Sequence, residues 1–148
     1  MIVTNKLNEC IFSIPSPFDE DKSIDLSISL RNKTKRNVKI INGSPYISLD
    51  IKLKAKILSV NNNTDYFEDN NLELIESYAN SYVKNLVDKY LYKTSKEFKS
   101  DIASFGKYAV IHFATWDKWI EYNWLNNYSN AFFNTNVDVD ISSGYLVS

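Results

Sequence analysis

The sequence has few residues of the kinds that form disulfides, metal sites or catalytic centres. Among its 148 residues there is one cysteine, Cys10, and one histidine, His112. A single cysteine cannot form an internal disulfide, and together these two residues supply too few ligands for a structural zinc site. A lone histidine with no adjacent nucleophile or orienting carboxylate gives no catalytic triad. We therefore predict no catalytic residue, no metal and no cofactor, and a protein that is not an enzyme; a hydrolase is the weakest alternative.

The sequence also has no excess of charge of one sign and no long apolar run. Seventeen basic residues balance 18 acidic ones, which gives a formal net charge of −1. The basic stretch 31–36 is shorter than the positive face that nucleic acid requires, so we predict no nucleic-acid partner. No run approaches the roughly 20 apolar residues of a membrane span. Residues 1–10 have neither the pattern of a signal peptide nor that of a lipid-acceptor site.

Aromatic residues are abundant by contrast. The chain contains ten Tyr, eight Phe and three Trp, and 44% of its residues are apolar. A chain of this length can bury a core of its own, so we predict one domain over residues 1–148. The surplus of rings leaves aromatic side chains available for an interface.

The first sixty residues alternate between apolar and polar side chains, as half-buried strands do. Cys10 lies in one predicted strand beside Ile11 and Phe12, 24–30 forms a second, and 47–57 forms the longest. Asn42-Gly43, which follows Val38 and Ile40, predicts a tight hairpin because both residues tolerate positive φ. Alternation returns at 137–141, which predicts a final strand that rejoins the sheet.

A helical period separates these strands. It predicts one long amphipathic helix whose apolar face consists of Leu72, Ile75, Ala79, Tyr82, Leu86 and Tyr90. A break near Ser100-Asp101 precedes a short helix over 105–113, and Thr115 can cap another helix that runs through Trp124 and ends at the asparagines of 126–130. The predicted fold is α+β, a mostly antiparallel sheet with one long helix and two shorter helices packed on one face, in the order β-β-β-β-α-α-α-β.

The segment 99–106, Lys-Ser-Asp-Ile-Ala-Ser-Phe-Gly, and the residues after it form a recognisable series. The series comprises Asp101-Ile102, Phe105-Gly106, Trp116, Asn123-Trp124, Val137, Val139, Ile141 and Gly144, with 43–51 as an earlier central strand. In order and spacing over residues 10–146 it resembles the C-terminal domain of the Ger(x)C family, the C subunits of spore germinant receptors. The proline that the family usually has before its first tryptophan is replaced here by Phe113-Ala-Thr115.

The resemblance implies a role in spore germination and no reaction. Ger(x)C proteins are two to three times longer, with a signal peptide, a lipidated cysteine and further domains ahead of this one. The chain is therefore expected to be an excised domain or a truncated product of such a lipoprotein. Its parent would lie at the outer face of the spore inner membrane, held there only by its lipid, and this piece itself would be soluble. The implied partners are the receptor A and B subunits or other germination proteins.

Seven residues of these motifs are candidate partner contacts: Asp101, Ile102, Phe105, Gly106, Trp116, Trp119 and Trp124. Structural roles explain most of them more simply. Asp101 fits a helix N-cap, Phe105 a core position, and Gly106 a bend or a close backbone approach. Trp116 and Trp124 are expected in the core, whereas Trp119 is open between core and interface.

Further candidates have ordinary structural interpretations as well. His112 is expected to be a packed or surface histidine, and Cys10 a small buried apolar residue. Asp138 and Asp140 share the polar side of the last strand, where solvated carboxylates are expected rather than a calcium site. A second hypothesis for the whole chain is a small-ligand module, with a pocket between sheet and long helix lined by Tyr78, Tyr82, Phe105 and Trp116.

Overall fold

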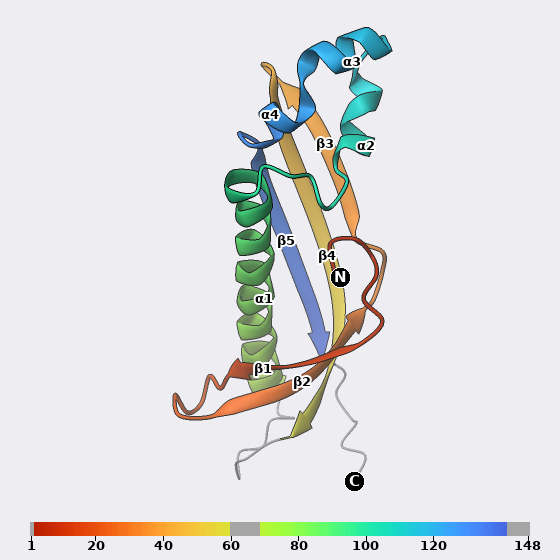
Figure 1. Cartoon of the computed structure of the whole chain (residues 1–148). Coiled ribbons are helices and arrows are strands. Elements are labelled where there is room, and N and C mark those ends of the chain that lie inside the picture. Colours follow the sequence, from red (N-terminus) through yellow and green to blue (C-terminus); the bar gives the residue numbers. More distant parts are fainter. Residues whose placement is uncertain (1, 60–68, 142–148) are drawn as a thin grey trace. The chain divides into compact units, whose positions relative to one another are not determined.

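The computed structural model describes residues 2–59 and 69–141 of the chain, without the side chains of 59, 69 and 70. Gly144 of the family-like series lies outside the described residues. The strands are β1 (Cys10–Pro15), β2 (Ser23–Leu30), β3 (Lys35–Ile41), β4 (Ser44–Ser59) and β5 (Phe132–Ile141). Between β4 and β5 lie α1 (Asp69–Tyr92), a π-helical turn (Lys93–Glu97), α2 (Gly106–Ala109), a 3₁₀ turn (Val110–His112), α3 (Trp116–Tyr122) and α4 (Trp124–Tyr128). The predicted α+β class and the order of strands, helices and strand are confirmed (Figure 1).

Within the described residues five strands form one sheet in the order β1-β2-β4-β3, with β5 paired to β4. β1 pairs with β2, and β2 and β3 pair with β4, all antiparallel. The predicted hairpin is confirmed at the β3–β4 turn, because Ile41 pairs with Ser44 around two residues of positive φ, Asn42 at 51° and Gly43 at 81°.

Two compact units divide the described residues. The first contains 2–34, 51–59, 69–84 and 137–141, and the second contains 35–50 and 85–136. The strands β4 and β5 and the helix α1 each run from one unit into the other. A single domain over residues 1–148 stays a prediction, and the two units are described separately below.

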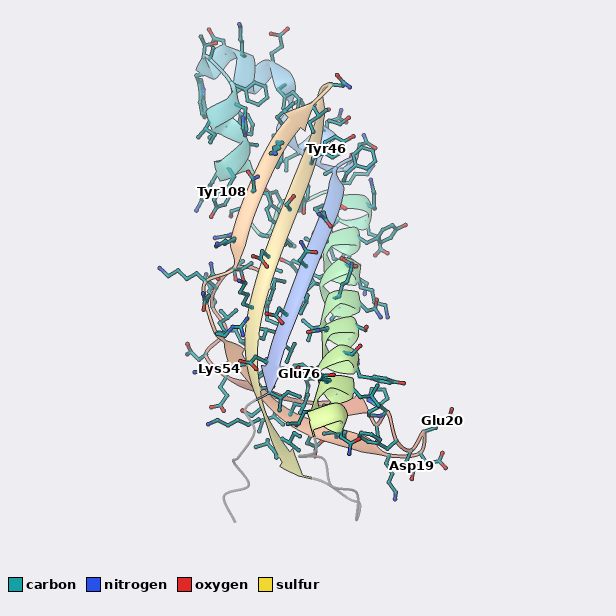
Figure 2. The ribbon with its side chains drawn as sticks, turned by 180° about the vertical axis from the view of Figure 1, so that it is seen from behind. Asp19, Glu20, Tyr46, Lys54, Glu76 and Tyr108 are labelled. Atoms are coloured by element: carbon teal, nitrogen blue, oxygen red, sulfur yellow. The ribbon has the colours of Figure 1, made fainter. Side chains whose placement is uncertain are left out.

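In the first unit, α1 lies beside β5 and bonds to its edge (Figures 1 and 2). The Asn80 side-chain oxygen accepts the backbone N–H of Val139 at 2.7 Å, and the Glu76 carboxylate accepts that of Ile141 at 2.9 Å. These bonds satisfy backbone donors that an edge strand would otherwise leave open. The core of this unit consists of apolar side chains of β2, β4 and α1, namely Ile24, Leu26, Ile28, Ile51, Leu53, Ala55, Leu72, Ile75, Ala79 and Val83.

The buried face of α1 differs from the predicted one after Ala79. The buried residues continue with Val83, Val87 and Leu91, whereas the predicted Leu86 is 48% exposed. Both series fit a helical period, since residues three and four positions on are neighbours on one side of a helix. The aliphatic series lies flat against the sheet, and the two predicted tyrosines lie at the border of the face, half-buried, as amphipathic side chains do.

After α1 the backbone passes through the π-helical turn and leaves helical geometry. Thr94 and Ser95 are buried in this turn, and both hydroxyls bond to the carbonyl of Leu91, at 3.1 and 2.7 Å. Lys99 then adopts a positive φ of 49°. The predicted break near 100–101 is confirmed, because no helical element covers 98–105.

The helix predicted to run from Thr115 through Trp124 is divided in two. Thr115 caps α3 as predicted, and its hydroxyl accepts the N–H of Lys118 at 3.2 Å. Asn123, however, adopts a left-handed conformation with φ 54°, so α3 ends at Tyr122 and Trp124 begins α4. Asparagine tolerates this region better than most residues, which explains why the helix ends here instead of at the asparagines of 126–130.

Candidate functional site

In the second unit, the carboxylate of Asp101 accepts three hydrogen bonds. Its Oδ1 accepts the backbone N–H of Phe105 at 2.8 Å, and its Oδ2 accepts that of Gly106 at 2.7 Å. The same Oδ2 accepts the indole Nε1–H of Trp124 at 2.9 Å. Asp101 thus satisfies N–H groups at the start of α2, although the N-cap position itself is Phe105. The expected capping role was therefore correct in kind and wrong in position.

Gly106 lies where a side chain would be tightly crowded. A Cβ added there would lie 3.0 Å from Trp124 Nε1 and 3.3 Å from Asp101 Oδ2. Its φ is not in the left-handed region, so space and not backbone conformation requires the glycine. The expected close approach is confirmed, and the group that approaches is an indole ring.

Phe105 and Trp124 belong to the core of this unit, as predicted. The side chain of Phe105 is fully buried, with its ring centroid 6.3 Å from that of Tyr128 and 6.4 Å from that of Phe133. Trp124 is also buried, and its ring centroid lies 5.6 Å from that of Tyr128. Burial raises the pKa of Tyr128 to about 12, and its hydroxyl lies 3.0 Å from that of Thr94.

Residues 106–124 form a segment that we call the helical lobe (Figure 1). Two bonds join it to the β3–β4 hairpin of the same unit: His112 Nε2 lies 2.6 Å from the carbonyl oxygen of Val38, and the Tyr122 hydroxyl donates to that of Gly43 at 2.8 Å. His112 is thus a surface histidine with a structural partner, as expected.

The interior of the lobe is aromatic. The rings of Phe113 and Tyr122 lie 4.7 Å apart, and Trp119 lies 5.4 Å from Phe113 and 5.8 Å from Trp124. Trp119, whose place was open between core and interface, is half-buried in this cluster.

The outer side of the lobe is apolar and exposed. Trp116 is 67% exposed, Ile120 60% and Ile111 77%, and we call these three residues the lobe face. The prediction that Trp116 lies in the core is wrong. In a helix of only seven residues, Trp119 and Tyr122 occupy the inner side, so Trp116 and Ile120, four positions apart, share the outer side. Ile102, the remaining candidate, is 54% exposed.

The carboxylates of Asp138 and Asp140 are exposed to solvent, as expected, and they also bind an arginine. In the first unit Arg31 binds both, with Nη2 2.6 Å from Asp138 and Nη1 3.3 Å from Asp140. The hydrogen bond that Arg31 donates to Asp138 raises the pKa of the arginine. Among the described residues, no group of three His, Cys, Asp or Glu side chains could hold a metal ion.

The other arginine of the short basic stretch also has an internal partner. In the second unit the Arg36 guanidinium lies 5.0 Å from the ring centroid of Tyr108, and its Nη1 donates to the Ala103 carbonyl at 3.4 Å. Cys10, expected to be buried, is half-buried, and burial raises the pKa of its thiol. A raised pKa lowers the thiolate fraction and hence the reactivity of this cysteine.

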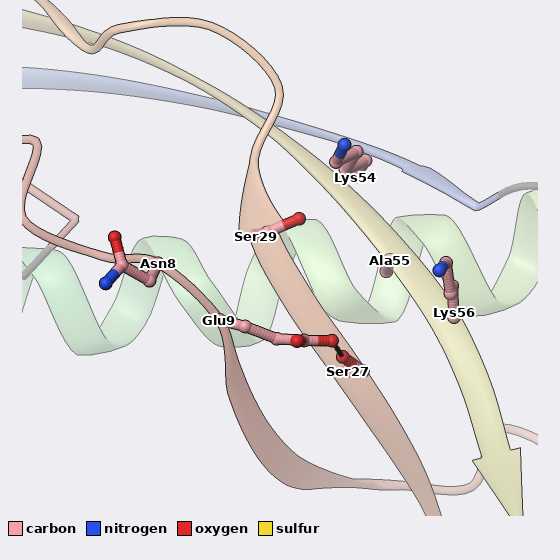
Figure 3. A pocket seen from close by; sticks show the side chains of 7 residues that line it. All are labelled: Asn8, Glu9, Ser27, Ser29, Lys54, Ala55 and Lys56. Carbon is pink, nitrogen blue, oxygen red and sulfur yellow. Dashed lines mark hydrogen bonds between the residues drawn. The ribbon is translucent and has the colours of Figure 1, made fainter.

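A polar hollow lies in the first unit at the crossing of the N-terminal segment, β2 and β4 (Figure 3). It is lined by Asn8, Glu9, Ser27, Ser29, Lys54, Ala55 and Lys56. The Ser27 hydroxyl donates to the Glu9 carboxylate, while the ammonium groups of Lys54 and Lys56 have no hydrogen bond or ion pair with another described residue.

None of the four residues predicted to line a ligand pocket contributes to this hollow. In the first unit, the ring of Tyr82 stacks on Phe12 at 5.5 Å and Tyr78 is 43% exposed. In the second, Phe105 is enclosed by other rings and Trp116 faces solvent. Of the helices within residues 2–59 and 69–141, none has the length and apolar character needed to cross a membrane.

Comparisons with known proteins agree with this fold. Residues 1–144 match the family described as "Spore germination B3/GerAC like, C-terminal". The crystal structure of the GerBC protein superposes with a TM-score of 0.71 at 18% sequence identity, over 95% of this chain and 42% of that chain. The chain thus spans 42% of the GerBC length, and at this identity the likeness shows a common fold. A search of curated protein sequences found no match. Because the family match covers nearly the whole sequence, the chain belongs to the spore germination B3/GerAC-like C-terminal family.

Proposed function

We propose that this chain is a non-enzymatic interaction domain of a germinant receptor C subunit, needed for the response to nutrient germinants. Its partners are the receptor A and B subunits or other germination proteins, and its contact surface is the lobe face. The family match supports a role in spore germination. The chain spans 42% of the length of the related GerBC protein, and the location that we propose, the outer face of the spore inner membrane, is that of the whole protein.

The observation that carries this proposal is that two consecutive elements of the lobe expose apolar side chains. These are Ile111 on the 3₁₀ turn and Trp116 and Ile120 on α3. α3 has rings on its inner side and Trp116 and Ile120 on its outer side. Trp116 and Ile120 lie four positions apart and are therefore neighbours on the helix surface, and exposed apolar side chains that lie together are typical of interaction sites. Tryptophan is also enriched among the residues that dominate binding energy at interfaces. The lobe face is therefore suited to burial against another protein.

The absence of catalysis is also part of the proposal. His112, which would be the natural general base, contacts a backbone carbonyl on the hairpin. The other strongly placed polar groups of this unit, Asp101 and the Tyr128 hydroxyl, have structural bonds within the fold.

Paired substitutions in the lobe face test the function. The double change Trp116→Ser and Ile120→Ser, made in the complete receptor protein, is expected to abolish co-purification of the A and B subunits and to impair germination with nutrients. Tyr92→Ser is the matched control, since Tyr92 is 59% exposed but lies outside the lobe. Unchanged co-purification and germination in the double variant, with normal protein levels, would contradict the proposal.

A second candidate function is the binding of a small polar ligand in the hollow of the first unit. It is favoured by two unpaired ammonium groups, of Lys54 and Lys56, beside the Glu9 carboxylate. Ligand binding to the folded state would raise the melting temperature progressively, with the logarithm of ligand concentration at saturation. A thermal-shift series with amino acids and sugars, repeated on Lys54→Gln/Lys56→Gln, decides this: the shift should occur in the parent chain and be lost in the variant.

A further inference from the structure

The two ends of the helical lobe meet at one oxygen atom. Oδ2 of Asp101 accepts the N–H of Gly106, where the lobe begins, and the indole N–H of Trp124, where it ends. The segment between these residues is therefore closed at its base by a single carboxylate. Hydrogen bonds to an ionised acceptor are about twice as strong as neutral ones, so this closure is a strong one for its size.

The closure has little slack. The absent Cβ of Gly106 leaves just enough room for the indole of Trp124, at 3.0 Å. Phe105, next to the first donor, is fully buried, and Trp124 is buried as well. One donor thus belongs to the buried Trp124 and the other to Gly106, which follows the buried Phe105, and Asp101, half-buried, accepts from both.

The helices of the lobe are too short to be stable without contacts to the rest of the unit. α2 has four residues and α3 has seven. Isolated helices shorter than about 12 residues are marginal in water, so tertiary anchors must fix them. Besides the Asp101 carboxylate, the described anchors between the lobe and the rest of this unit include the His112 and Tyr122 contacts with the hairpin and the ring contacts of Trp124.

We infer that Asp101 is a positioning residue for the docking surface: it closes the base of the lobe and so fixes the orientation of Trp116 and Ile120. The inference rests on the proposed function and assigns one of the candidate contact residues a different role. Asp101 acts through the lobe, and no contact with the partner is required of it.

Asp101→Asn tests the closure without changing the volume of the side chain. The amide retains one acceptor oxygen and places an N–H group opposite an N–H donor, so at least one of the three bonds is lost. We expect amide hydrogen exchange across 107–123 to become about tenfold faster or more, with exchange in α1 unchanged. Asp117→Asn is the matched control, since Asp117 is an exposed aspartate of the lobe that lies outside the closure.

Trp124→Phe is a second route to the same result, because it removes the indole donor while Asp101 stays. Its control is Trp116→Phe, the same truncation at an exposed ring of the lobe that does not bond to Asp101. Exchange should rise in 107–123 for the first variant and stay near the parent rate for the second. If Asp101→Asn left exchange in 107–123 unchanged, or raised it equally in α1, the positioning role would be wrong.

Binding separates this inference from the proposed function. With the A and B subunits as the probe, and at a temperature where all variants are folded, Asp101→Asn should weaken capture about tenfold, and Asp117→Asn should not. If Trp116→Ser does not weaken capture, the proposed function fails, whatever the exchange data show. If Trp116→Ser weakens capture and Asp101→Asn does not, the function stands and the positioning role is overturned.

Discussion

The helical lobe exposes apolar side chains to solvent, whereas the first unit exposes charged and polar ones. We call the latter set the polar face; it comprises Glu9, Ser27, Arg31, Asp138 and Asp140. On the polar face, Arg31 binds Asp138 and Asp140, and Glu9 accepts a bond from Ser27. These groups are charged or hydrogen-bonded, and water can bind their remaining donors and acceptors. The lobe exposes Trp116 and Ile120, which gain nothing from water. The comparison indicates that a protein partner is better sought on the lobe.

A third exposed set lies on the sheet of the second unit and sharpens this contrast. Tyr46 and Phe132 stack at 4.8 Å while they remain 38% and 56% exposed (Figure 2). These two rings cover each other, and such cross-strand aromatic pairs stabilise a sheet by themselves. Trp116 has no ring contact with another described residue, so exposed aromatic area on the sheet has an internal explanation that the lobe face lacks.

The largest expected effect contrasts a core residue next to the lobe, Phe105, with a residue of the lobe face, Trp116. Phe105→Ala removes a fully buried ring and should lower the free energy of unfolding by about 3–5 kcal/mol. Trp116→Ala, with its side chain mostly in solvent, should change it by less than about 0.5 kcal/mol. Denaturant titration of both variants measures the difference. A comparable loss in the two variants would mean that Trp116 is buried in solution, and the contrast between the two sides would fail.

The next effect concerns the buried phenol beneath the lobe. Burial raises the pKa of Tyr128 from 10.0 to about 12. Below pH 10 the phenol is protonated in both states and stability does not depend on it. Between pH 10 and 12 the unfolded chain releases the proton while the native state keeps it, so the free energy of unfolding falls, by about 2–3 kcal/mol in total.

Tyr128→Phe removes this titration. Its unfolding free energy should fall less steeply between pH 10 and 12 than that of the parent chain, although it starts lower because the bond to Thr94 is lost. Urea titrations at several pH values give both profiles. Parallel profiles would show that the Tyr128 phenol does not titrate differently in the two states.

Local patterns in the sequence predicted much of the fold. Alternation located the strands, Asn42-Gly43 located the hairpin, and the helical period located α1. These features depend on neighbours within a few residues, which a pattern of period two or 3.6 records directly. The later half of the α1 face was missed because two neighbouring series fit the same period, and packing against the sheet selects one.

The candidate site could be predicted only in part, for the same reason. The motif residues were recognised, but their roles depend on partners far along the chain: Trp124 lies 23 positions from Asp101, and Asp138 lies 107 positions from Arg31. No local signal reports such a pairing. The exposure of Trp116 was missed because helical periodicity shows which residues share one side of a helix, and not whether that side is buried or exposed.

The smallest expected effect lies on the polar face. Arg31→Gln removes the two contacts with Asp138 and Asp140, which are exposed to solvent and therefore screened. The denaturation midpoint should move slightly at low salt and not at all at 1 M salt, where the screening length is about 3 Å. Midpoints of the parent and variant at the two salt concentrations test this. A loss that persists at 1 M salt would show that the Arg31 bridge holds β5 in place, and the polar face would then be a structural element of the first unit and not merely its solvated surface.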